Sequence, residues 1–246
     1  MSKDVLLITG ASSDIGLALI RRVVSMRKDC IVLAHHHASG ERIEELRKSL
    51  GCDSISPLQA DFSSADSTLE MAERILSEFG APSQFVHLPG LKLIYERFTK
   101  FNWEHFESDL NIQVRSAVIL LRRFLPAMAK SPNSKVVFVL SSVTRGVPPK
   151  YLSMYGMVKQ AQLGLMRALA SEYADTGLQV NAVSPGLVET RFLDNVPDMI
   201  KQMGAAASPG GRNAQPDDVV KVIEFLLSAE SGSVNGIQLP VTGGAV

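Results

Sequence analysis

The chain has 246 residues, 46% of them hydrophobic, with 25 basic and 25 acidic side chains and a pI near 7.0. This length suits one large α/β domain, and the balanced charge excludes the basic patch expected of a nucleic-acid-binding protein. No apolar stretch reaches the roughly 18 residues that a membrane-spanning helix needs, so no span is expected.

Short β-branched runs alternate with longer segments of helical period along the whole chain. The predicted strands are, in chain order, 5–9, 31–33, 55–58, 85–88, 135–140, 178–183 and 236–241. The predicted helices are 14–28, 40–50, 64–79, 103–129, 152–175 and 216–228. Continuously apolar strands that alternate with helices indicate right-handed crossovers. We expect one α/β domain over 1–246, a Rossmann-like, doubly wound parallel sheet of about seven strands with helices on both faces.

One long segment, 185–215, shows no strand pattern and is expected to be irregular. Long irregular segments inside compact domains are typical of functional lids, so we predict a substrate-side lid here. Its apolar side chains indicate an apolar or partly apolar substrate, although ordinary packing explains them equally well. They are Phe192, Leu193, Val196, Met199, Ile200 and Met203.

The cysteines and the first residues indicate the compartment. Cys30 and Cys52 are too few for a disulfide framework and predict free thiols in a reducing environment. The first twenty or so residues are apolar-rich, but Lys3, Asp4 and Asp14 interrupt them and no small-residue cleavage site follows. A cytoplasmic protein without a signal peptide is expected.

A glycine-containing turn follows the first predicted strand, where α/β domains bind the pyrophosphate of a dinucleotide. Gly10 permits the tight turn, and Gly16 allows the helix to pack closely. The predicted cofactor-binding residues of this turn are Gly10, Ser12, Ser13, Ile15 and Gly16. Asp14 adds bulk and negative charge, and we interpret it as the N-cap of the following helix.

Tyr155 and Lys159 lie four residues apart and therefore share one helix face. A neighbouring ammonium stabilises a phenolate, so Lys159 is expected to lower the pKa of Tyr155 toward the range of acid–base catalysis. Ser142 ends a predicted strand, where its hydroxyl can hydrogen-bond a substrate oxygen as charge develops.

Several ordered motifs make nearly the whole chain resemble the short-chain dehydrogenase/reductase family. They are Thr9-Gly10…Gly16, Asp61, Gly90, Ser142, Tyr155-x-x-x-Lys159, the segment from Asn181-Ala182 through Pro185-Gly186 to Thr190, and Gly236…Gly243-Gly244. The resemblance implies that Tyr155 is the general acid or base, that Lys159 tunes it and binds the nicotinamide ribose, and that Ser142 orients the carbonyl. It also implies that Asp61 and Phe62 flank adenine, that Gly90 lies along its ribose, and that Pro185, Gly186, Val188 and Thr190 line the nicotinamide.

The chain departs from the family pattern at two further places. The usual Asn-Asn-Ala-Gly after the fourth strand is His87-Leu88-Pro89-Gly90, for which local repacking is expected. The helix asparagine that holds a water in the family's proton relay aligns with Gln113, which keeps the amide on a longer side chain. We therefore assign Gln113 to the catalytic set.

The residues after the second strand indicate the cofactor. His35 and His36 are assigned to its binding site, and no acid occurs there before Glu41, so NADP(H) is favoured over NAD(H). Three successive histidines raise the alternative of a metal site. Adjacent strand residues point to opposite faces and no nearby cysteine or carboxylate completes a site, so we expect no metal.

The predicted function is an NAD(P)H-dependent oxidoreductase that interconverts a ketone and a secondary alcohol. The nearest resemblance is to β-ketoacyl-carrier-protein reductases, which implies a small or carrier-bound carbonyl substrate and a homo-oligomer, either dimer or tetramer. The carrier-docking positions fall on Asn133 and Thr176, with Lys130, Lys135, Arg122 and Arg123 nearby as substitutes. The alternative is a nucleotide-binding domain with weak or no catalysis that acts as a binding or regulatory partner.

Overall fold

A computed structural model describes residues 4–244 as a seven-stranded parallel sheet with the strand order β3-β2-β1-β4-β5-β6-β7. The strands are β1 (Asp4–Thr9), β2 (Cys30–His36), β3 (Ile55–Gln59), β4 (Gln84–His87), β5 (Lys135–Val139), β6 (Gln179–Pro185) and β7 (Gln238–Val241). The helices are α1 (Asp14–Met26), α2 (Glu41–Leu50), α3 (Ala65–Phe79), α4 (Trp103–Leu110), α5 (Ser116–Met128), α6 (Ser153–Glu172), α7 (Asp198–Ala207) and α8 (Pro216–Leu227). The predicted doubly wound Rossmann-like fold is confirmed.

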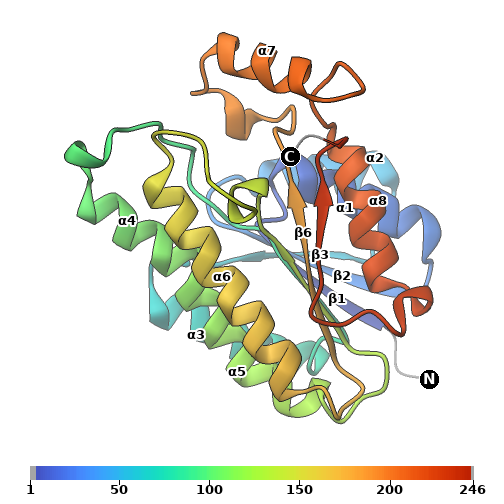
Figure 1. The fold of residues 1–246 in the computed structure, drawn as a ribbon. Coiled ribbons are helices and arrows are strands. Elements are labelled where there is room, and N and C mark those ends of the chain that lie inside the picture. Colours follow the sequence, from blue (N-terminus) through green and yellow to red (C-terminus); the bar gives the residue numbers. More distant parts are fainter. Residues whose placement is uncertain (1–3, 245–246) are drawn as a thin grey trace.

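Helices cover both faces of the sheet (Figure 1). Successive residues of a strand point to opposite faces, and β1 shows the consequence. Leu7 packs with α3, α5 and α6 in one core, whereas Leu6 and Ile8 pack with α1, α2 and α8 in the other. Because all seven strands run parallel, their carboxyl ends meet at one edge of the sheet, where α7 also lies (Figure 1).

Three elements differ from the prediction. The strand expected over 31–33 continues to His36, because His35 and His36 pair with Leu58 and Gln59 of β3. The helix expected over 103–129 contains a π-helical segment, η2 (Asn111–Arg115), between α4 and α5. The segment 185–215 is not irregular throughout, since it contains the short 3-10 turn η4 (Arg191–Leu193) and helix α7.

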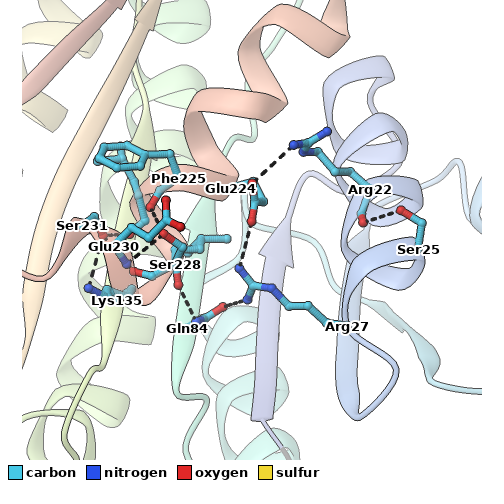
Figure 2. Close-up of polar contacts among 12 residues, drawn as sticks. Arg22, Ser25, Arg27, Gln84, Lys135, Glu224, Phe225, Ser228, Glu230 and Ser231 are labelled. Carbon is cyan, nitrogen blue, oxygen red and sulfur yellow. Dashed lines mark hydrogen bonds and ion pairs between the residues drawn. The ribbon is translucent and has the colours of Figure 1, made fainter.

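A polar network joins α1 and α8 at the amino ends of the strands (Figure 2). Arg27 donates to Gln84 at 2.7 Å and lies 3.9 Å from Glu224, while Gln84 donates to the Leu227 carbonyl at 2.9 Å. Lys135 is buried in the same region and donates to Ser231 and Gln179. The hypothesis that Lys135 docks a carrier protein is therefore wrong, because its ammonium is enclosed by the fold.

Two buried histidines connect strand ends to neighbouring elements. His87 donates from Nε2 to the Gln113 carbonyl at 2.8 Å, which leaves Nδ1 to accept from Thr9 at 2.9 Å. His35 donates from Nε2 to the Ala60 carbonyl at 3.1 Å and accepts from the Gly10 N–H at 3.0 Å. Burial lowers the pKa of each ring to about 3, so both histidines are neutral at physiological pH.

These histidines predict sensitivity to acid. Histidine in an unfolded chain has a pKa near 6.5. Below that pH these two rings are protonated in the unfolded state but stay neutral in the folded state. Stability should fall as pH decreases from about 6.5 toward 3, by up to about 1.4 kcal/mol per pH unit for each ring. Urea unfolding at pH 7 and pH 5 measures this loss. His87→Asn should reduce the slope and the exposed His37→Asn should leave it unchanged; equal stability at both pH values would contradict the prediction.

Candidate active site

A cavity of about 970 Å³ opens at the carboxyl ends of the strands and contains nearly every predicted site residue. Its lining includes Gly10, Ser12, Ser13, Ile15, His35, His36, Asp61, Phe62, Gly90, Gln113, Ser142, Tyr155, Lys159, Pro185, Gly186, Val188 and Thr190. Gly16 is the one predicted residue that is not in this lining. The fold therefore brings residues from most of the chain into one connected space.

The glycine turn is closed by backbone contacts. Gly10 has a φ of +71°, and a Cβ there would lie 2.9 Å from the Pro89 backbone. A Cβ on Gly16 would lie 2.5 Å from the Ala11 carbonyl oxygen. Gly16 thus allows α1 to start directly against the turn, which aims the first turn of the helix into the cavity.

Asp14 is not the N-cap of α1, and that prediction was wrong. Ser13 holds the cap position and accepts from the Gly16 N–H, so its hydroxyl oxygen is partly engaged. Asp14 instead accepts from Arg42 at 2.7 Å and from the Arg191 N–H at 2.8 Å. Desolvation opposes the charge on Asp14, yet these arginine contacts prevail and lower its pKa. Its negative charge in the turn is thereby compensated.

Tyr155 lies on the cavity wall from α6, with its ring centroid 6.0 Å from that of Phe192. Burial raises the pKa of Tyr155 to about 12, while a hydrogen bond with the Ser141 hydroxyl lowers it and the charge of Asp109 raises it further. The expectation that Lys159 brings this pKa toward neutrality was wrong, because burial dominates and the ammonium of Lys159 is not among the groups that shift it. The phenol is therefore protonated throughout the physiological pH range.

Lys159 is buried one helical turn after Tyr155. Its ammonium lies 5.8 Å from the Tyr155 ring centroid and donates to the Val139 carbonyl at 2.9 Å and to Gln162 at 3.1 Å. Burial lowers the pKa of Lys159 to about 8, and the charge of Asp109 opposes this shift. The side chain therefore carries a positive charge near neutral pH, with its ammonium enclosed by acceptors.

The two serines after β5 occupy different positions in the site. Ser142 begins the 3-10 turn η3 (Ser142–Thr144), is partly exposed and lines the cavity. Ser141 caps that turn, is buried, and has the hydroxyl that contacts Tyr155. The sequence assigned only Ser142, since the family spacing selects one serine and does not show which hydroxyl reaches the phenol.

Gln113 lies in the π-helical segment and is buried. Its side chain donates to Asp109 at 2.5 Å, and its Oε1 has no hydrogen-bond partner among the described residues. Its main-chain carbonyl accepts from both His87 and Gln162. The Gln113 backbone is therefore linked to Lys159 only through Gln162, and the role of the Gln113 amide in a relay stays a prediction.

Comparisons with known proteins agree with this geometry. The family model described as "Enoyl-(Acyl carrier protein) reductase" matches residues 10–246. The chain is 30% identical over 242 residues to an acetoacetyl-CoA reductase of Allochromatium vinosum, covering 97% of this chain and 96% of the relative. It is 28% identical over 247 residues to a 3-oxoacyl-(acyl-carrier-protein) reductase of Thermotoga maritima, covering 98% and 97%. This chain belongs to the short-chain dehydrogenase/reductase family.

A solved structure of the same family supports the assignment. A glucose/ribitol dehydrogenase of Brucella melitensis, titled as a short-chain dehydrogenase/reductase, superposes with a TM-score of 0.88 at 26% identity, covering 100% of this chain and 98% of that one. The protein is accordingly an NAD(P)-linked oxidoreductase that acts on CH–OH and C=O groups.

The 185–215 segment of this family member packs against Tyr155. Leu193 and Val196 form an apolar cluster with Leu93, Val143 and Leu152, and Tyr155 and Phe192 pack against it. Met199 and Met203 are both largely exposed, and of the two only Met203 lines the cavity. The segment thus covers Tyr155 with apolar side chains.

Several cavity residues were missed by the sequence analysis. Tyr95, Lys92 and Lys150 lie in the lining but come from loops without motifs. Arg42 lies in the first turn of α2, five residues beyond the histidine run, and reaches back to Asp14 and the Ser12 carbonyl. A basic residue in the first turn of this helix could have been predicted from the sequence to reach the cavity, because the helix begins beside the glycine turn.

Within residues 4–244, no helix has the length and apolar character needed to cross a membrane. The same part of the chain holds no group of three or more His, Cys, Asp or Glu side chains arranged to bind a metal ion. Cys30 and Cys52 are both free thiols, as the sequence predicted.

Proposed function

We propose that the protein is an NADPH-dependent reductase of 3-oxoacyl thioesters. The observation that carries this proposal is the arrangement of Tyr155, Lys159 and the two serines at the inner end of the cavity. The relatives named acetoacetyl-CoA reductase and 3-oxoacyl-(acyl-carrier-protein) reductase support the substrate class. The predicted lid supports an acyl chain, because the side chains over Tyr155 are apolar.

The cavity has the chemistry that a dinucleotide requires. Its volume of about 970 Å³ lies at the upper end of cofactor pockets, which span about 300–1,000 Å³. The glycine turn and the start of α1 form an anion-binding end, with Ser12 and Ser13 as further donors. The charge of Asp14 is neutralised by arginines. Pro185, Gly186, Val188 and Thr190 would hold the nicotinamide, and Lys159 its ribose.

The catalytic residues are suited to reduction. A bound NADPH supplies the hydride for the carbonyl carbon. The neutral phenol of Tyr155 donates its proton to the carbonyl oxygen as negative charge develops there, and a serine hydroxyl donates a hydrogen bond to the same oxygen. Oxidation requires the phenolate, which a pKa of about 12 makes scarce at neutral pH. The protonated phenol is thus the form that the proposed reduction uses.

Two exposed lysines support an anionic substrate. Lys92 and Lys150 line the outer part of the cavity, within reach of the phosphates of a coenzyme A or phosphopantetheine group entering from solvent. Between them and Tyr155 the wall is formed by apolar side chains such as Leu93 and Leu152. A thioester with a charged carrier end and an apolar acyl end matches a cavity that is basic at its outer part and apolar near Tyr155.

Turnover of acetoacetyl-CoA with NADPH tests the proposed function. Tyr155→Phe should lower kcat by about 10²–10⁴-fold, because the proton donor is lost. Ser142→Ala should lower kcat by about 10²-fold through the lost hydrogen bond to the carbonyl oxygen, and Ser141→Ala by less. A larger loss in Ser141→Ala would transfer the oxygen-binding role to Ser141.

The same assay separates the competing functions. Undiminished activity in Tyr155→Phe would refute the assigned acid, and cofactor binding without turnover of any ketone or thioester would favour a binding domain. An enoyl thioester is the comparison substrate, because the matched family model carries that description. Equal kcat/KM for a carrier-bound 3-oxoacyl thioester and its small-thiol analogue would exclude recognition of a carrier protein.

The preference for NADP(H) is supported by the surroundings of the glycine turn. At the end of β2 and directly after it, the cavity is lined by His36, His37 and Ser39, none of them acidic, and Arg42 adds a positive charge beside Asp14. Both ring nitrogens of His35 are already hydrogen-bonded within the fold. We therefore assign Arg42, and not His35, as the group that makes this end attractive to the extra phosphate.

NADPH should bind more tightly than NADH, and Arg42→Met should raise the Kd for NADPH about tenfold, or about 1.4 kcal/mol. The cause is the lost cation together with the Asp14 carboxylate, which is then compensated only by Arg191. Fluorescence titration with both cofactors measures this. Arg47→Met, on the same helix but paired with Glu44 and Asp53, is the control. Tighter binding of NADH by the wild type would contradict the preference.

The proposed homo-oligomer is supported by exposed apolar side chains near α4 and α6. Phe98 and Trp103 are each 70% exposed, and Tyr151 and Met157 are about half exposed. Such side chains gathered on one region are typical of an interface. Light scattering should give the mass of a dimer or tetramer; Trp103→Glu should reduce it, and a monomeric wild type would contradict the proposal.

A further inference from the structure

The ammonium of Lys159 is held by a side chain to which nothing so far assigns a role. Gln162 follows three residues later on α6, is fully buried, and accepts from Lys159 through Oε1 at 3.1 Å. The amide orientation is dictated by its partners. Lys159 has only donors, so the amide oxygen must face it.

The other end of the same amide is anchored on the backbone. Gln162 Nε2 donates to the Gln113 carbonyl at 3.0 Å, and His87 donates to that carbonyl at 2.8 Å. The carbonyl lies in the π-helical segment, where the wider turn disturbs the regular ladder of backbone hydrogen bonds. A single side chain therefore spans from the buried ammonium to a carbonyl of the neighbouring helix.

Other groups also face Lys159. Tyr155 lies beside it on α6, and the neutral ring of His87 faces it from β4. Asp109 on α4 is the one buried carboxylate among the described residues, and its negative charge raises the pKa of Lys159. Asp109 uses its Oδ1 to accept from Gln113 and, more weakly at 3.5 Å, from the Leu91 N–H. Its influence is that of a nearby charge, whereas Gln162 contacts the ammonium directly.

We propose that Gln162 is a positioning residue for Lys159, which it holds in place and in its charged form beside Tyr155. The proposal rests on the proposed function for its catalytic consequence, but not for the state of the lysine. The Gln162 amide lies between Lys159 and the Gln113 carbonyl, and its oxygen accepts a hydrogen bond from the ammonium. An amide does not release protons near neutral pH, so Gln162 cannot take the proton of Lys159. Gln162 thus favours the charged form of Lys159 and fixes where its ammonium lies.

The sign of the effect on pH dependence follows. Burial lowers the pKa of Lys159 to about 8, so the ammonium is lost as pH rises through that value and reductase activity should fall with it. A hydrogen bond to the ammonium favours the charged form. Removing it should move the alkaline limb of kcat to lower pH, and replacing it with a carboxylate should move the limb to higher pH.

The test uses Gln162→Leu and Gln162→Glu, with Gln160→Leu as the control. Gln160 is on the same helix but exposed, with one long hydrogen bond to the Thr144 carbonyl at 3.3 Å. Gln162→Leu should lower kcat about tenfold, shift the limb down by about one pH unit, and leave KM for the thioester within about twofold. Gln162→Glu should shift the limb upward, and Gln160→Leu should not shift it.

A second readout does not need turnover. Labelling of Lys159 by acetic anhydride across a pH series, read by mass spectrometry, reports the fraction of neutral amine and should shift in the same directions. If both Gln162 variants fold, as judged by thermal unfolding, and keep the wild-type limb and labelling curve, Gln162 only packs the core and the proposal is overturned. If Gln162→Leu does not fold, the near-isosteric Gln162→Glu decides alone. A wild type without reductase activity refutes the proposed function, whereas the labelling curve still decides the role of Gln162.

Discussion

The buried charge of Lys159 is the constraint around which the rest of the site is arranged. Removing an ammonium from water is costly unless acceptors replace its hydration. Here the Val139 carbonyl at the end of β5 and the Gln162 amide on α6 supply them, with the charge of Asp109 nearby. The strand end, the helix face and the π-helical segment must therefore keep their relative positions for the charge to be tolerated.

This constraint explains the local departures from the family pattern. His87 occupies a place that the family gives to asparagine, and it joins the Thr9 hydroxyl to the Gln113 carbonyl as a neutral ring. Gln162 meets the same carbonyl from α6. The π-helical carbonyl is therefore an acceptor shared by β4 and α6, which places His87, Gln113 and Gln162 in one connected network.

A second balance of charge operates at the other end of the cavity. Asp14 carries a carboxylate into the glycine turn, and the guanidinium groups of Arg42 and Arg191 compensate its charge from two separate elements. The contact with Arg191 also links the glycine turn to the start of the segment that covers Tyr155. The glycine turn and the segment over Tyr155 are therefore joined by one carboxylate.

The amino-acid sequence by itself determined the order of strands and helices, the doubly wound sheet and most of the residues that line the cavity. These depend on local periodicity and on the rule that parallel strands present their carboxyl ends together. Only the tertiary structure decided the partners of Asp14, the contact of Ser141 with Tyr155, and the bridge from Lys159 through Gln162 to Gln113. Arg42 is 28 residues from Asp14, and Gln162 is 49 from Gln113. Contacts over such separations depend on how helices pack across the sheet and on the rotamers that packing permits, and neither leaves a periodic signal in the chain.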